Sequence, residues 1–212
     1  NSALAALIYQ GNLNYNGEDT LTIVTNDLGN FGDADGDGTP GESADDALLD
    51  QDSLLIELEA VNDDPIANND AAEALEAGGT SNTAAGVNPK GNLLSNDTDV
   101  DIATNDDKLH LVSISSGSSS VLVPSSGSVT LVGVYGDLVV DATGSYQYVV
   151  HNDDPDVQAL LAAQSLTEQF SYQIADIEGA TASAVLNITL RGANDNPVGV
   201  NDQGTATEAG GV

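Results

Sequence analysis

Two runs of alternating aspartates carry the strongest chemical signal in the chain. In the first, Asp33, Asp35 and Asp37 alternate with small residues, and Gly38 follows. This pattern is the front half of an EF-hand-type loop, in which the aspartates supply monodentate oxygens and the glycine allows a sharp turn. The bidentate Glu expected at loop position 12 is missing, because Ala44 stands there. We expect calcium at this loop, with an acidic insert that binds no metal as the alternative.

The second run is Asp97, Asp99 and Asp101. On an extended backbone, alternate side chains fall on the same side of the chain. The three carboxylates would therefore converge, and Ca²⁺ is bound by six to eight oxygens from carboxylates, carbonyls and amides. The alternative is a set of Asx-turns that shape a loop without metal.

Two linkers repeat the same acidic sequence 132 residues apart. Residues 61–70 match residues 193–202 without a gap, and Glu76-Ala77-Gly78-Gly79 matches Glu208-Ala209-Gly210-Gly211 at the same offset. A self-match at a fixed offset indicates a tandem array of domains. In each linker an Asn-Asp pair precedes a proline that holds the chain extended. We interpret both copies as calcium-binding linkers between β-domains.

Short strands separated by turns must position these residues. Period-two alternation of apolar residues with regular turns is typical of an antiparallel β-sandwich of the immunoglobulin type. One short helix is predicted at Asp156–Gln164. The predicted strands are Asp19–Thr25, Ser53–Ala60, Ile66–Leu75, Gly91–Ser95, Lys108–Ser115, Ser128–Val134, Asp137–Asp141, Ser145–Val150, Glu168–Ala175 and Thr181–Leu190.

The repeat offset predicts how the domains divide. Residues 1–62 are expected to be the C-terminal part of one β-domain, with its acidic calcium loop, and residues 63–195 a complete β-sandwich. Residues 196–212 are expected to be the first strand of a following repeat. The predicted fold class is therefore all-β, with tandem sandwich domains joined by calcium-binding linkers.

In such a sandwich, the loops that carry Asp97–Asp101 and Asp176 return to the end of the domain where the linker enters. We expect them to face Asn62 and Asp63, with Asp27 as the counterpart of Asp176 in the first domain. Glu76 is expected to add a carboxylate from the first strand. The candidate calcium ligands are Asp27, Asp33, Asp35, Asp37, Asn62, Asp63, Glu76, Asp97, Asp99, Asp101, Asp176, Asn194 and Asp195.

Three motifs in this order resemble the VCBS repeat family. They are Gly91–Asp101, then Tyr135–Tyr148, and finally Phe170–Gly179, and Gly192–Pro197 closes the unit. The linkers also resemble those of cadherin-like domains. The resemblance implies a repeat of a large secreted bacterial adhesin with RTX-type export, located at the cell surface. Ile102, Ala103 and Ile177 depart from the family pattern.

The charge balance excludes several classes of partner. The chain has 34 acidic and three basic residues and a formal net charge of −31. So few cations cannot neutralise the phosphates of a nucleic acid or hold an anionic membrane surface. Neither His110 nor His151 neighbours a second His, the chain has no Cys, and no Gly-x-Ser-x-Gly motif is present. No enzymatic activity and no insertion into a membrane are therefore expected.

The function favoured by these features is a calcium-rigidified extracellular repeat in the stalk of a bacterial adhesin or biofilm-matrix protein. Its partners would be neighbouring repeats or other copies of the chain, together with an unidentified surface ligand of the parent protein. The alternative is a subunit of a self-assembling filament, in which the C-terminal strand of one chain completes the N-terminal domain of the next. No sequence feature favours a carbohydrate-binding role.

Overall fold

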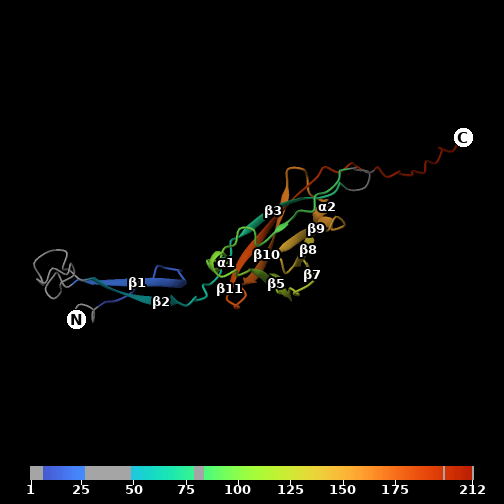
Figure 1. The fold of residues 1–212 in the computed structure, drawn as a ribbon. Coiled ribbons are helices and arrows are strands. Elements are labelled where there is room, and N and C mark those ends of the chain that lie inside the picture. Colours follow the sequence, from blue (N-terminus) through green and yellow to red (C-terminus); the bar gives the residue numbers. More distant parts are fainter. Residues whose placement is uncertain (1–6, 27–48, 79–83, 198, 212) are drawn as a thin grey trace, which may run out of the picture. The chain divides into compact units, whose positions relative to one another are not determined.

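The computed structural model describes residues 7–26, 49–78, 84–197 and 199–211 (Figure 1). The chain divides into two units, Asn1–Asn62 and Asp63–Val212. In the described part of the first unit, β1 (Gly17–Asn26) and β2 (Leu49–Leu58) form an antiparallel ladder. Both strands overlap those predicted from the alternation of apolar residues.

The second unit is a sandwich of two sheets (Figure 1). The five-stranded sheet has the order β3-β11-β10-β5-β6, and the four-stranded sheet has the order β4-β9-β8-β7. The strands of this unit are β3 (Asp70–Leu75), β4 (Lys90–Asn92), β5 (His110–Ser116), β6 (Ser119–Leu122), β7 (Ser128–Val132), β8 (Gly136–Asp141), β9 (Ser145–Val150), β10 (Ser165–Ala175) and β11 (Thr181–Arg191).

The predicted all-β sandwich is confirmed, with three local differences. The edge strand β3 pairs in parallel with β11, so the larger sheet is mixed rather than purely antiparallel. Strand β6 was not predicted, because its sequence Ser-Ser-Val-Leu is half serine and continues the serine-rich stretch around Gly117, which is typical of a turn. The described residues of 196–212 lie in neither a helix nor a strand, although a strand was predicted there.

Within the described residues, two short helices join strands of the second unit. Helix α1 (Asp101–Thr104) lies between β4 and β5, in a stretch predicted to be extended. Helix α2 (Pro155–Gln158) is capped by the Asp154 carboxylate, which accepts hydrogen bonds from the amides of Asp156 and Val157. It covers only the first part of the predicted helix Asp156–Gln164, because Ala159 already forms its C-cap.

The core lies between the two sheets and follows the period-two pattern of the strands. In β11, Leu186, Ile188 and Leu190 are buried, and they alternate with more exposed residues. The rings of Tyr148 in β9 and Phe170 in β10 meet edge to face, with centroids 6.0 Å apart. This contact joins one sheet to the other, as expected for aromatic residues of a sandwich core.

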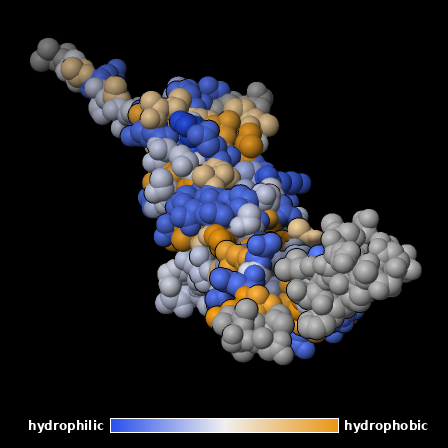
Figure 2. Space-filling view, turned by 60° about the vertical axis from the view of Figure 1, so that its left-hand side comes forward, coloured by the Kyte–Doolittle hydropathy of each residue, from blue (hydrophilic) through white to orange (hydrophobic). Residues whose placement is uncertain are grey.

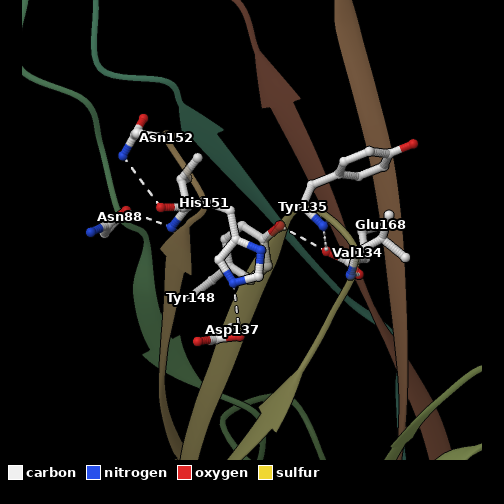
Figure 3. A network of polar contacts seen from close by, with 9 residues as sticks. Asn88, Val134, Tyr135, Asp137, Tyr148, His151, Asn152 and Glu168 are labelled. Atoms are coloured by element: carbon white, nitrogen blue, oxygen red, sulfur yellow. Dashed lines mark hydrogen bonds and ion pairs between the residues drawn. The ribbon is translucent and has the colours of Figure 1, made fainter. Parts of the chain in front are cut away.

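One buried carboxylate links the two sheets across the core (Figure 3). The Glu168 side chain in β10 is buried, and its oxygens accept hydrogen bonds from the amides of Val134 and Tyr135 and from the Tyr148 hydroxyl. These donors belong to the β7–β8 turn and to β9 in the opposite sheet. Beside them, the His151 ring lies 2.9 Å from a carboxylate oxygen of Asp137.

Candidate metal centre

Three carboxylates meet at the end of the sandwich where β10 ends and α1 lies. One oxygen from each of Asp99, Asp107 and Asp176 lies within 4.8 Å of the other two. Asp107 and Asp176 are buried, and Asp99 is half-buried. The three residues belong to the segment before α1, the segment after it, and the turn between β10 and β11.

Backbone amides hold each of these side chains in place. One oxygen of Asp99 accepts from the Asp101 amide at 2.8 Å, and one oxygen of Asp107 accepts from the Ile177 amide at 3.0 Å. Asp176 accepts from the amides of Gly179 and Ala180 at 2.5 and 2.8 Å. The second oxygens of Asp99 and Asp107 are buried and have no hydrogen-bond partner within the described ranges.

This arrangement is unfavourable without a cation. Burial raises the pKa of Asp99, and the charges of Asp107, Asp101 and Asp176 raise it further, while the hydrogen bond from the Asp101 amide opposes the shift. At an effective dielectric constant of about 20, two like charges about 4 Å apart repel by about 4 kcal/mol. A buried oxygen without a donor adds to this cost.

The site fits a hard divalent cation. Calcium binds oxygens at about 2.3–2.6 Å, so two oxygens on one ion lie at most about 5 Å apart. The carboxylate oxygens of Asp99, Asp107 and Asp176 meet this condition. In each of the three side chains one oxygen accepts from a backbone amide, which restricts the carboxylate and preorganises the site.

The other two members of the Asp97–Asp101 run do not join this group. An oxygen of Asp97 accepts from the Asn68 amide at 2.7 Å, and the oxygens of Asp101 accept from the Asp63 amide and the Asn105 side chain. The expected convergence of three alternate carboxylates is wrong because the backbone is not extended. Val100 already has helical backbone angles, φ −67° and ψ −34°, and Asp101 begins α1.

Asp101 still connects this end of the sandwich to the linker, because it binds the backbone of Asp63. Sequence reasoning missed Asp107, which replaces Asp101 in the group of three. Asp107 follows α1 and the positive-φ residue Asp106, and the Asp107 amide bonds back to the carbonyl of Asp101. No local spacing reveals that turn, although the sequence Asp106-Asp107 before a strand was a usable signal.

Glu76 lies at the opposite end of β11, just beyond β3. Its side chain is fully buried, and one oxygen accepts from the Ala193 amide at 2.6 Å. The other oxygen has no hydrogen-bond partner in the part of the chain that the structure describes. Burial raises the pKa of Glu76, the Ala193 hydrogen bond lowers it, and the charge of Asp195 raises it. Glu76 and Asp195 are therefore close enough to interact.

The remaining candidate ligands lie outside the described residues or in the two linkers. Asp27, Asp33, Asp35 and Asp37 lie outside the described residues. Asn62 ends the first unit, and Asn194 donates a hydrogen bond to the carbonyl of Asp195. None of these positions tests the predicted role in calcium binding.

Comparison with known proteins gives the chain a family. The family model described as bacterial cadherin-like domain matches residues 62–192, which is more than half of the chain. No curated protein matches the sequence. None of the helices in the described ranges is long and apolar enough to cross a membrane. The residues that the family model matches contain the whole β-sandwich of the second unit. The chain therefore belongs to the bacterial cadherin-like domain family.

Proposed function

We propose that this chain is a calcium-stabilised structural repeat of an extracellular bacterial protein, of the kind that forms the stalk of an adhesin or a biofilm matrix. Cadherin-like domains are structural modules, which fits a role in adhesion. The observation that carries the proposal is the group of Asp99, Asp107 and Asp176, because two of its buried oxygens have no hydrogen-bond partner among the residues that the structure describes.

The position of this group gives calcium a mechanical role. Asp101, two residues from Asp99, accepts a hydrogen bond from the amide of Asp63, the residue that begins the second unit. A cation at Asp99 would remove the repulsion around α1 and order the segment that holds Asp63. Calcium would thus couple the stability of the sandwich to the order of its linker.

Glu76 and Asp195 support a second calcium position at the other end of the sandwich. A fully buried carboxylate with an unpartnered oxygen requires a counter-charge or a proton. The neighbouring linker repeats Asn62-Asp63 as Asn194-Asp195. With calcium at both ends, each repeat would be stiffened at its junctions, as expected for a stalk rather than for an enzyme.

Calorimetric titration of calcium into chelated protein tests the proposal. The variant Asp107→Asn should lose at least about tenfold in affinity for one ion, which is about 1.4 kcal/mol. The control Asp153→Asn removes an equal charge at an exposed position and should bind like the parent protein. Equal binding by Asp107→Asn and Asp153→Asn would show that the acidic group is not a calcium site.

The mechanical role has its own measurement. Small-angle scattering should give a longer maximum dimension in calcium than in chelator, because ordered linkers keep neighbouring units extended. The profile of Asp107→Asn should respond less to calcium than that of Asp153→Asn. Profiles that superimpose with and without chelator would leave calcium as a stabiliser of the sandwich and remove its proposed effect on the linker.

A further inference from the structure

The longest stretch of the chain without a charged side chain runs from Leu109 to Gly136. It contains no Asp, Glu, Lys or Arg, in a chain that has 34 acidic and three basic residues. This stretch forms β5, β6 and β7. Strands β6 and β7 are outermost in their two sheets and lie against each other, so they form one side of the sandwich. We call it the uncharged side.

Charge rather than apolar area distinguishes the uncharged side. The space-filling view shows hydrophobic residues in separate patches among hydrophilic ones (Figure 2). On the uncharged side Leu122 is 76% and Val132 is 67% exposed, but Ile177 near the metal centre is 62% exposed as well. A second copy of this chain carries the same formal charge of −31, so two copies repel each other wherever acidic surfaces meet. The uncharged side is therefore where two copies can approach with the least repulsion.

Among the described residues, β7 has one edge without a ladder partner. It pairs with β8 alone, and every residue from β5 to β9 is described. The Gly133 amide donates to the carbonyl of Gly136, which makes these two residues a hydrogen-bonded pair. Hydrogen-bonded and non-hydrogen-bonded pairs alternate along an antiparallel ladder. The amides and carbonyls of Ser128, Thr130 and Val132 therefore point away from β8, toward the free edge.

The edge of β6 is a shorter template. The Val123 amide donates to the carbonyl of Val112 in β5, so by the same alternation the backbone groups of Ser120 and Leu122 point outward. Pro124 follows directly and has no amide to donate. Strand β7 thus offers three outward residues in its ladder where β6 offers two. An open edge of this kind is a template for pairing with another chain.

We propose that β7 of one copy of this chain pairs with β7 of a second copy as antiparallel strands, which joins the two four-stranded sheets into one continuous sheet. The register follows from the outward backbone groups. Thr130 in the middle of the strand lies opposite the partner's Thr130, and Ser128 lies opposite the partner's Val132. Every outward amide and carbonyl of β7 then has an acceptor or a donor. Because both copies use the same strand, the contact closes on itself and ends at a dimer.

The carboxylates of the neighbouring strand stay apart in this arrangement. On β8, Asp137 lies opposite Val132 and Asp141 lies opposite Ser128. Asp141 of one copy and the partner's Asp137 are thus three strand spacings apart, which is about 14 Å. This distance exceeds the Debye length of about 8 Å at physiological ionic strength. Asp137 also lies 2.9 Å from the His151 ring of its own copy. Repulsion across the paired edges is therefore weak.

The symmetry of the contact sets how the two copies run. Strands of the two sheets in a sandwich run within about 30° of each other, so antiparallel pairing of β7 reverses one whole sandwich relative to the other. Copies that extend from two facing surfaces meet in this orientation, whereas neighbours that extend from one surface run parallel. For a stalk repeat, as proposed above, the contact would join facing surfaces, although the pairing of β7 does not itself depend on that role.

Disulfide trapping of single-cysteine variants tests the register, because the chain has no cysteine of its own. In a thiol–disulfide buffer Thr130→Cys should cross-link with itself, since paired strands lie within the range of a disulfide. Ser128→Cys should cross-link with Val132→Cys, and the mixture should give at least about fivefold more dimer than either variant alone. Thr167→Cys, at an exposed threonine of β10, measures cross-linking by random collision. Salt at ~1 M would screen the remaining repulsion between copies.

Two outcomes of the trapping experiment would overturn the proposal. One is a yield for Thr130→Cys no higher than that for Thr167→Cys, because the central pair of the ladder would then be missing. The other is that Ser128→Cys and Val132→Cys each cross-link with themselves as well as in the mixture. Parallel pairing gives that pattern, and it would contradict both the two-fold symmetry and the orientation.

A pair of proline variants tests which edge is used. Thr130→Pro removes the central outward amide of β7, and Ser120→Pro removes an outward amide of β6. Proline is tolerated at strand edges where the amide faces solvent, so both variants should keep the far-ultraviolet circular dichroism of the parent protein. Equilibrium sedimentation in chelator should show dimerisation at least about tenfold weaker for Thr130→Pro, and unchanged for Ser120→Pro. A parent protein that stays monomeric at high salt, or equal effects of the two prolines, would overturn the proposal.

Pairing of β7 and calcium binding can fail separately. Both experiments give their results in chelator, because none of the substituted residues belongs to an acidic group at the ends of the sandwich. Loss of calcium binding with intact cross-linking would contradict the proposed function alone. Normal calcium binding without cross-linking would contradict β7 pairing alone.

Discussion

Individual carboxylates in this protein carry opposite shifts in pKa, and the shifts follow their surroundings. Burial raises the pKa of Asp70, and the hydrogen bond from the Tyr172 hydroxyl opposes this. Arg191 lowers the pKa of Glu73, first through a hydrogen bond and then through its charge. Asp70 is half-buried, whereas Glu73 is exposed. The two residues lie three positions apart in β3 and make a matched pair for a pH experiment.

We expect Asp70→Asn and Glu73→Gln to change the pH dependence of stability in opposite directions. Because its pKa is raised in the folded state, Asp70 contributes its full stabilisation of the fold below its ordinary pKa of 3.8. This contribution is lost as the pH rises through the raised pKa. Relative to the parent protein, Asp70→Asn should therefore become more stable as pH rises from about 4 to 7. Glu73 has a lowered pKa in the folded state, so its contribution to stability is present above its ordinary pKa of 4.5 and is lost as the pH falls through the lowered pKa.

Urea unfolding in chelator at several pH values measures both effects. The shift expected for Asp70→Asn is about 1 kcal/mol or less, since one unit of pKa is about 1.4 kcal/mol and the side chain is half-exposed to water. Glu73→Gln should lose stability relative to the parent protein at neutral pH and regain it in acid. Parallel pH profiles for the two variants would contradict the assigned shifts.

At the scale of elements, the β7–β8 turn is held to β10 by one side chain. Glu168 binds the amides of Val134 and Tyr135 and the Tyr148 hydroxyl (Figure 3). Glu168→Ala leaves these donors without an acceptor and should cost about 3 kcal/mol in the free energy of unfolding. Tyr148→Phe removes one donor only and should cost about 1 kcal/mol.

Denaturant unfolding measures whether Glu168→Ala destabilises the second unit more than Tyr148→Phe does. Glu73→Ala serves as the control, because its ion pair with Arg191 is exposed to water and exposed ion pairs contribute little to stability. Amide exchange should also quicken in the β7–β8 turn of Glu168→Ala. If Glu168→Ala were no more destabilising than Glu73→Ala, the carboxylate would be an incidental neighbour of the turn rather than its anchor.

Helix α2 gives a smaller and more local prediction. Asp154 caps both free amides of its first turn, so Asp154→Ala should destabilise the second unit by about 1 kcal/mol. Asp153→Ala changes the adjacent exposed residue, for which the structure gives no capping contact, and should have little effect. Thermal unfolding in chelator compares the two variants. Equal melting temperatures for Asp154→Ala and Asp153→Ala would contradict the role of the cap.

Some elements of the fold could be predicted from the sequence alone and others could not. Strands such as β9 and β11 were predictable because buried and exposed residues alternate along them. Strand β6 was not, because its polar sequence takes its conformation from pairing with β5. The same distinction holds at the metal centre. Asp99 and Asp176 were predicted, but Asp107 reaches them through a turn after α1 that depends on tertiary contacts with Ile177.

At the scale of the whole molecule, net charge dominates. A formal charge of −31 on 212 residues destabilises the folded state through self-repulsion. Monovalent salt relieves this repulsion by screening, and the Debye length falls from about 10 Å at 0.1 M to about 3 Å at 1 M. Calcium at the acidic ends would act differently, because it binds a few oxygens at short range.

Thermal unfolding in NaCl, MgCl₂ and CaCl₂ separates screening from binding. Both NaCl and MgCl₂ should raise the melting temperature gradually, whereas CaCl₂ should raise it at far lower concentration and then saturate. Magnesium requires near-ideal octahedral geometry and retains its water, so it should bind the Asp99–Asp107–Asp176 group poorly. In Asp107→Asn the calcium effect should shrink while the NaCl effect stays. Coincident curves for calcium and magnesium would indicate screening alone, because a binding site of this geometry must distinguish the two ions.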